Sequence, residues 1–181
     1  MVPAIAMTLW ADERKTGTIE LLLTLPVRLV DAVLGKFLAA WVLTGIALTL
    51  TFPIWVTVNY LGDPDNGVIV AAYLGSWFMA GGFLAIGSCV SACTKNSVIA
   101  FILTVAICFL FVIMGSPILL NTFPSWMPQW LVDAFSVMGF LTHFDSISKG
   151  VLDVRDFLFF SVFIGGWLLA SAIVIEMKKA N

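Results

Sequence analysis

Four long apolar runs are the sequence feature that most constrains the fold of this chain. They occupy residues 37–61, 68–93, 98–120 and 156–175. A helix that crosses the hydrocarbon core of a bilayer needs about 20 mostly apolar residues, so each run is long enough to be a span. The runs are also too long and too uniform for a soluble core. The sequence therefore predicts an all-α fold, a polytopic membrane helix bundle in one transmembrane domain.

The overall composition agrees with a lipid environment. Of the 181 residues, 61% are hydrophobic and only 11% are charged, whereas a soluble domain carries about 25% charged residues. Seven tryptophans and fifteen phenylalanines suit interfacial and lipid-facing surfaces. No basic patch is visible, so membrane lipid is expected as a partner and nucleic acid is not.

Two further segments are apolar but do not fit a span. Residues 1–11 are too short, and they lack the basic start and the cleavage site of a signal peptide. We expect them to be the end of a span whose beginning is missing, in an N-terminally truncated chain. Residues 121–155 are interrupted by Pro124 and Pro128, and they are expected to form an external interfacial or re-entrant segment. Within the first run, Pro53 lacks a backbone donor and is expected to kink the helix.

Lysine and arginine are unevenly distributed between the two ends of the predicted spans. Seven fall on one side and two on the other. Because positively charged loops stay on the cytoplasmic side of a membrane, this asymmetry sets the orientation. It predicts that residues 12–36, residues 94–97 and the C-terminus are cytoplasmic, and that residues 62–67 and 121–155 are external.

Residues 12–36 are the one long charged stretch in the sequence, and a short helix is expected within them. Thr16 or Thr18 offers a hydroxyl that can cap a helix N-terminus, Glu20 suits the positive end of the helix dipole, and Pro26 ends the helix. Its apolar face is typical of a helix that docks into a groove on a partner protein. The alternative is a helix on the lipid surface, which is less favoured because the charges are mixed in sign. The residues predicted to make the docking contact are Thr16, Gly17, Thr18, Ile19, Glu20, Leu22, Leu23, Leu25 and Pro26.

Small residues recur at every fourth position in the second run. Gly81, Ala85, Cys89 and Cys93 follow this spacing, which lets helix backbones approach closely. We expect this face to pack within one bundle, and a seam between two copies is the alternative.

The sequence lacks the residues that catalysis or ion-coupled transport would need. The span interiors contain no ionisable residues, which argues against a proton relay or an ion-coupled carrier. His143 is the single histidine, and it is expected to be a structural hydrogen-bonding residue at the interface. Cys89 and Cys93 share a helix face but lack a third metal ligand, so they are expected to be packing residues. No phosphate-binding loop is present. The chain is therefore expected to hold no metal or cofactor, and not to be an enzyme.

Two motifs resemble those of a known family. Residues 13–26, ERKTGTIELLLTLP, resemble the first cytoplasmic segment of ABC-2-type transporter permeases. Residues 142–145 and 149–156 resemble the pattern before the last span in one branch of that family, which contains the gliding-motility and nitrous-oxide-reductase-maturation permeases. The matching positions of this second motif in the external segment are His143, Phe144, Gly150, Asp153 and Asp156.

The resemblance implies a type II exporter-like transmembrane domain in the bacterial inner membrane. It implies that two permease copies, or two homologous permeases, pair with separate ATP-binding-cassette ATPase subunits, which bind the ATP and magnesium. Residues 16–26 would then transmit the closure of those subunits. On these grounds we interpret the chain as the permease subunit of an ATP-driven transporter. The alternative is a non-transporting membrane anchor or assembly subunit of a motility or cofactor-maturation complex.

Overall fold

The computed structural model describes residues 1–19, 28–116, 137–150 and 153–179 of the chain. Within these ranges the protein contains helices and no strand, which confirms the predicted all-α fold. The helices, in chain order, are α1 (Val2–Ala6), α2 (Ala11–Thr16), α4 (Leu29–Thr49), α5 (Phe52–Leu61), α6 (Asn66–Cys93), α7 (Ser97–Met114), α10 (Phe140–Ser148) and α11 (Val154–Lys179).

Four stretches in the described part of the chain are long and apolar enough to cross a membrane. They are Leu29–Leu61, Asn66–Cys93, Ser97–Met114 and Val154–Lys178. Many of their large apolar side chains face outward, as expected where lipid is the solvent. The polytopic helix bundle that the apolar runs predict is therefore confirmed.

The bounds of the helices differ from those of the apolar runs. α4 begins at Leu29, eight residues before the first run, because Asp31 suits the positive end of its dipole and Lys36 has an acidic partner. α7 ends at Met114, and the rest of the third run, from residue 117, lies outside the described residues. Residues 121–136 and 151–152 of the segment 121–155 also lie outside them, but its described part contains the nine-residue helix α10.

Residues 1–11 do not form one continuous helix. α1 ends at Ala6, a turn follows, and α2 begins at Ala11. Ala6 is fully buried against α6, where a Cβ added at Gly87 would lie 2.3 Å from the Cβ of Ala6. This close approach is possible because Gly87 has no side chain, and it holds α1 on the central helix.

Proline interrupts the first span where the sequence predicts it. α4 ends at Thr49 and α5 begins at Phe52, with Pro53 in the first turn of α5. Because proline has no N–H, the carbonyl one turn earlier loses its helical partner and the helix breaks. The hydroxyl of Thr51, between the two helices, donates to the carbonyl of Leu48 at 2.6 Å.

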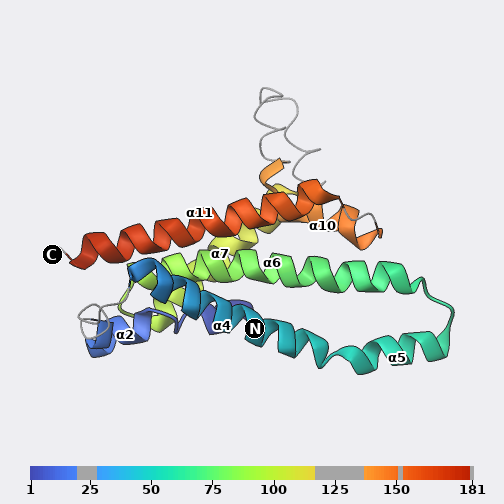
Figure 1. Cartoon of the computed structure of the whole chain (residues 1–181), viewed down its shortest axis with the longest axis horizontal. Coiled ribbons are helices and arrows are strands. Elements are labelled where there is room, and N and C mark those ends of the chain that lie inside the picture. The colour runs from blue at the N-terminus through green and yellow to red at the C-terminus, as the bar shows by residue number, and fades with distance from the viewer. Residues whose placement is uncertain (20–27, 117–136, 151–152, 180–181) are drawn as a thin grey trace.

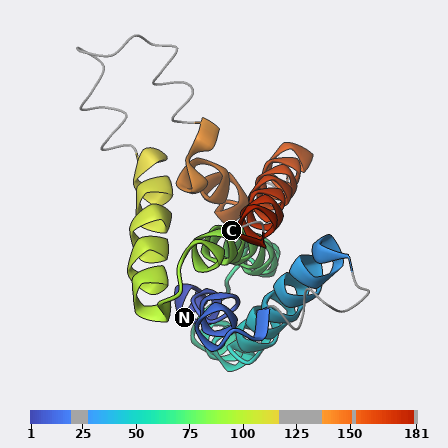
Figure 2. The same ribbon diagram turned by 90° about the vertical axis from the view of Figure 1, so that its left-hand side faces the viewer.

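Helix α6 is the centre of the bundle. It packs against α1, α4, α7, α10 and α11, and the views in Figure 1 and Figure 2 show these helices arranged around it. The small residues of α6 make this possible. A Cβ added at Gly81 would lie 2.9 Å from the indole nitrogen of Trp41 and 3.0 Å from the Cδ1 of Ile164. This part of the small-residue face therefore packs within the bundle.

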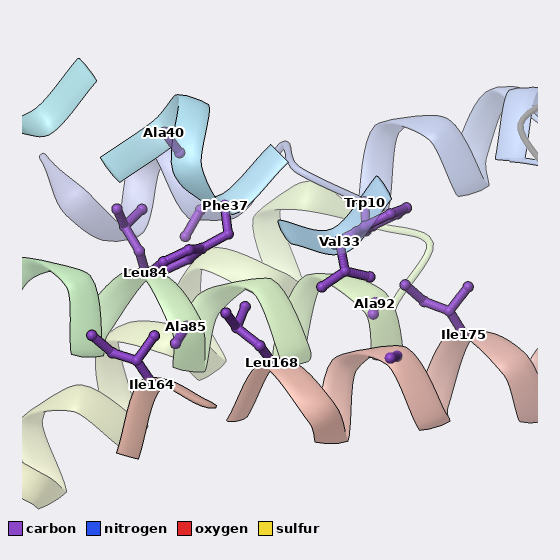
Figure 3. Packing of buried hydrophobic residues seen from close by; sticks show 12 residues of the cluster. Trp10, Val33, Phe37, Ala40, Leu84, Ala85, Ala92, Ile164, Leu168 and Ile175 are labelled. Atoms are coloured by element: carbon purple, nitrogen blue, oxygen red, sulfur yellow. The ribbon is translucent and has the colours of Figure 1, made fainter. Parts of the chain in front are cut away.

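Two clusters of buried apolar side chains hold the bundle together. The first joins α4, α6 and α11 to the N-terminal helices, and Figure 3 shows Trp10, Phe37, Leu84 and Leu168 within it. The second centres on Phe140 of α10, whose fully buried ring packs against aromatic rings of α6, α7 and α11. These rings belong to Phe83, Phe111, Phe159, Phe160 and Phe163.

The end of α7 and the start of α10 meet backbone to backbone. A Cβ added at Gly139 would lie 2.2 Å from the Cα of Gly115. Only glycine permits this approach, because any side chain at position 139 would overlap the other backbone. The contact brings together the two points at which the chain enters and leaves residues 117–136.

Candidate functional site

Helix α2 opens the charged segment of the sequence and lies at the same end of the bundle as the C-terminus of α11 (Figure 1). Asp12 and Glu13 occupy its first turn and Arg14 and Lys15 its last, so both pairs complement the helix dipole. Gly17 ends the helix in the left-handed conformation, with φ of 75°. Glycine adopts this conformation without steric cost, which explains why the helix stops there.

A serine of α6 caps the N-terminus of α2. The Ser91 hydroxyl accepts hydrogen bonds from the backbone N–H of Trp10 at 3.0 Å and of Ala11 at 2.9 Å. It donates its own hydrogen to the carbonyl of Met7 at 2.8 Å. Ser91 is fully buried, so water could not take its place as the hydrogen-bond partner of these backbone groups. One side chain 80 residues away in sequence therefore fixes where α2 begins.

Trp10 anchors the same region in the core. Its ring is fully buried, and its indole nitrogen donates to the Ser88 hydroxyl at 3.1 Å. The Lys36 ammonium of α4 lies 4.1 Å from the centroid of the Trp10 ring, within range of a cation–π interaction. Lys36 also donates to the carbonyl of Leu9 at 2.9 Å and forms an ion pair with Glu13. Through Lys36, helix α4 thus contacts Leu9, which precedes α2, and Glu13, which lies in its first turn.

Two further contacts join α2 to the ends of α6 and α7. Arg14 donates from Nη1 to the carbonyl of Ala92 at 2.5 Å, near the C-terminus of α6, where a cation is favoured by the helix dipole. The Asp12 carboxylate accepts a hydrogen bond from the hydroxyl of Ser97, the first residue of α7. Side chains from one short helix therefore reach α4 and the ends of α6 and α7.

The predicted docking residues lie directly after this anchored helix. The Thr16 hydroxyl donates to the carbonyl of Asp12 at 2.9 Å and lies 3.0 Å from the hydroxyl of Thr18. The Thr16 hydroxyl therefore donates to a carbonyl within α2, the helix of which Thr16 is the last residue. The sequence had instead predicted that Thr16 or Thr18 caps the N-terminus of the following helix. Residues 18–19 are helical again, and Ile19 packs against the first buried cluster. The other predicted docking residues lie outside the described residues, namely Glu20, Leu22, Leu23, Leu25 and Pro26.

The second motif comes together between α10 and α11. His143 and Asp156 face each other with 2.6 Å between Nδ1 and Oδ1, and their side chains are only 11% and 7% exposed. The hydroxyl of Ser146 donates to the other carboxylate oxygen at 3.0 Å. The His143 ring stacks on Phe159 with 4.1 Å between centroids, and its Nε2 lies 2.9 Å from the carbonyl of Val137. His143 is thus a hydrogen-bonding residue, and Asp156, which lies at the predicted start of the last span, is buried.

Of the remaining motif residues, Phe144 lies on α10, and Gly150 and Asp153 lie in the connection between the same two helices. Phe144 lies beside Gly75 of α6, and Gly150 follows α10 with a positive φ of 82°. Asp153 accepts a hydrogen bond from the backbone N–H of Arg155 at 3.0 Å, which satisfies a free donor at the start of α11. All five positions of the motif therefore belong to one structural unit.

Sequence reasoning missed the residues that anchor α2. Ser88 and Ser91 lie three apart on α6, a spacing that indicates a polar contact with a neighbouring helix but does not identify that helix. Trp10 precedes the charged segment and Lys36 is its last residue, and nothing in their spacing indicates that they meet. In the described part of the chain, no group of three or more His, Cys, Asp and Glu side chains is arranged to hold a metal ion.

The comparison with protein families covers most of the described helices. Residues 3–129 match the model of the ABC-2 family transporter protein family, a range that holds the anchored helix α2 and the spans from α4 to α7. No curated protein matches the chain at a significant level. Because the family match covers more than half of the chain, this multi-pass membrane protein belongs to the ABC-2 transporter family and is a permease component of an ABC transporter.

Proposed function

We propose that this chain is the permease subunit through which an ABC transporter moves its substrate across the bacterial inner membrane. A separate ATPase subunit binds and hydrolyses the ATP, with its magnesium, and residues 16–26 dock into that subunit. A second permease, identical or homologous, completes the membrane part of the complex. The His143–Asp156 unit supports placing the chain in the gliding-motility and nitrous-oxide-reductase-maturation branch.

The anchoring of α2 is the observation that carries this proposal. An element that receives movement from an ATPase has to pass the movement on to the spans. Ser91 holds the start of α2 on α6, Lys36 ties it to α4, and Ser97 ties it to α7. Because α6 packs against the other spans, displacement of α2 is expected to shift the bundle as a unit.

The charges around α2 support a cytoplasmic position for it. Arg14 and Lys36 lie at this end of the bundle, and Lys178 donates there to the carbonyl of Cys93 at 2.5 Å. Positive residues favour the cytoplasmic side of a membrane. The C-terminus is therefore proposed to be cytoplasmic, on the side where an ATPase finds ATP.

Co-purification of the permease with its ATPase tests the docking. Leu22→Asp removes an apolar contact worth about 1.5–3 kcal/mol and places an unpaired charge in the interface. The ATPase is then expected to be lost in detergent while the permease remains in the membrane fraction. Thr24→Asp is the matched control, since it adds the same charge on another side of a helix through these residues and should retain the ATPase.

Two outcomes would contradict the proposal. Normal recovery of the ATPase with Leu22→Asp would mean that residues 16–26 do not form the contact. ATP hydrolysis by the reconstituted wild-type complex that responds to no substrate would favour the membrane anchor over the transporter.

A further inference from the structure

We propose that the groove between α10 and α11 binds one glycerophospholipid of the membrane, with its phosphate on Arg155 and an acyl chain along α11. The inference is independent of the proposed docking to an ATPase. It rests on a groove whose lining changes from basic to apolar along one helix. It also rests on a guanidinium that no carboxylate in the described part of the chain neutralises.

The groove is open to the surroundings of the bundle. It has a volume of about 740 Å³ and lies on the half of α11 that is far from α2 (Figure 1). Leu158 and Val162 in its lining are 60% and 73% exposed, so the described helices leave them uncovered. The other lining residues that matter here are Thr142 and His143 of α10 and Arg155 and Phe159 of α11. Exposed apolar side chains in such a groove favour an apolar occupant.

The lining residues of α11 are ordered like the groups of a phospholipid. Arg155, Leu158 and Val162 are three and four residues apart, so they share a helix face. Arg155 is the second residue of the span Val154–Lys178, and Val162 lies about 10 Å further along the axis at about 1.5 Å per residue. The guanidinium is therefore placed at the depth of the lipid phosphates, and the apolar side chains at the depth of the acyl chains.

The Arg155 guanidinium is available to bind an anion. The carboxylate of Asp153 accepts a hydrogen bond from the backbone N–H of Arg155, at 3.0 Å. The carboxylate of Asp156 is bound by His143 and Ser146. Among the described residues, no carboxylate lies within ion-pair distance of the guanidinium itself. A phosphodiester suits this position, because the planar guanidinium can donate two parallel hydrogen bonds to two of its oxygens.

Thr142 offers a second hydrogen-bond donor in the same groove. It is exposed, and its hydroxyl has no hydrogen-bond partner in the described part of the chain. His143 does not compete for the lipid, because each of its ring nitrogens already faces an oxygen atom of the protein. Phosphate and ester oxygens of a lipid both accept from a hydroxyl. We therefore expect Arg155 and Thr142 to hold the polar part of the lipid.

Two other lipid-facing surfaces lack this combination and serve as references. Helix α7 exposes Ile102 and Phe109, but its sequence contains no charged residue. Helix α4 exposes Leu38, and the nearby Lys36 is already paired with Glu13. Lipid on these faces has no cation to hold its phosphate.

Lipid titration of the purified full chain measures the affinity of the groove. Native mass spectrometry from detergent counts the lipids bound to each protein. Phosphatidylglycerol is expected to bind in a first, saturable step. Diacylglycerol with the same chains lacks the phosphate, and glycerol 3-phosphate lacks the chains, so neither should bind in this step. Binding of either compound as tightly as phosphatidylglycerol would overturn the proposal.

Substitution of Arg155 tests the phosphate contact. Arg155→Gln removes the charge and is expected to weaken the first binding of phosphatidylglycerol by at least about tenfold, because charge-assisted hydrogen bonds are lost. Lys149→Gln is the matched control, since it removes a positive charge from an exposed ion pair that does not line the groove, and it should bind as wild type. Unchanged affinity in Arg155→Gln would overturn the proposal.

Photocrosslinking shows where the acyl chain lies. Phosphatidylglycerol with a diazirine in one acyl chain, added to the wild-type chain in the same detergent, should crosslink to residues 158–163. Excess unlabelled phosphatidylglycerol should remove these crosslinks, whereas excess diacylglycerol should not. Crosslinks spread equally over α4, α7 and α11 would mean that lipid only coats the protein, and would overturn the proposal. If Arg155→Gln fails to fold, this mapping of the wild type decides.

Discussion

Trp41 of α4 and Trp77 of α6 stack with 4.5 Å between ring centroids and 17° between ring planes, and each indole donates to the backbone carbonyl of the other residue. The two N···O distances are 3.0 and 3.2 Å. Each tryptophan is followed four residues later by a glycine, Gly45 or Gly81, that makes room for the opposite ring. The pair satisfies both indole N–H groups inside a membrane bundle, where water is not available to do so.

Gly45→Ala is expected to destabilise the protein because the added Cβ would lie 2.9 Å from Trp77 Nε1. The ring cannot move aside without losing its stacking partner and its hydrogen bond. Overpacking of this kind costs about 1–3 kcal/mol, which should lower the thermal unfolding midpoint of the purified protein by several degrees.

Gly35→Ala, also on α4, is the matched control, since no side chain or neighbouring helix lies within 4 Å of the position that the added Cβ would occupy. Alanine forms helix better than glycine by up to about 1 kcal/mol, so this variant should be as stable as wild type or more stable. Equal midpoints for the two variants would show that the tryptophan pair does not constrain the approach of α4 to α6.

Ser91→Ala is expected to loosen α2 while leaving the spans intact. It removes the acceptor for the N–H groups of Trp10 and Ala11, and an unpaired buried donor costs about 1–3 kcal/mol. Amides of residues 7–16 should then exchange with solvent at least about tenfold faster. In the complex, the ATPase should still bind, but its hydrolysis should no longer respond to substrate.

Ser148→Ala is the control for the loss of a serine hydroxyl, because the hydroxyl of Ser148 is exposed and, among the described residues, donates within its own turn to the carbonyl of Asp145. It should leave both the exchange of α2 and the coupled ATPase activity unchanged. Coupled activity that survives Ser91→Ala would mean that movement reaches the spans by a route other than α2.

The native cysteines provide a test of orientation. Cys93 is exposed at the end of α6, whereas Cys89 and Cys108 are buried. An impermeant thiol reagent should therefore label wild type only after the cells are permeabilised. Asp63→Cys, made in a Cys93→Ser background, should be labelled in intact cells, since residue 63 is exposed at the other end of the same helix. The reverse pattern would invert the proposed topology, and Cys93→Ser alone should remain unlabelled.

Most of the bundle could be predicted from the sequence because spans depend on local properties. Apolar length located the membrane helices, and the missing N–H of Pro53 located the break between α4 and α5. The bounds were less accurate, since the start of α4 at Leu29 depends on Lys36 finding a carboxylate in α2. The central position of α6 could not be predicted, because it depends on how all the helices assemble. Its small residues indicate that another helix packs closely against it, but they do not identify that helix.

The candidate sites depend on contacts that sequence spacing does not encode. Ser91 and Ala11 are 80 residues apart, and the whole span Leu29–Leu61 and most of α6 lie between them along the chain. His143 and Asp156 belong to one motif, but they lie on different helices, so no helical period relates them. Asp156 is the first residue of the last predicted span, and its burial could not be predicted because α10 supplies both the histidine and the serine that bind it.

The backbone contact between Gly115 and Gly139 bears on how this protein can evolve. The contact fixes the two ends of the intervening chain, and the entropy of closing a loop rises by only about 0.6 kcal/mol when its length doubles. Insertions and deletions within residues 117–136 are therefore expected to leave this contact between α7 and α10 in place. Related permeases are therefore expected to differ more in the length of that segment than in the identity of the two glycines, because an added methyl group at Gly139 would overlap the backbone of Gly115.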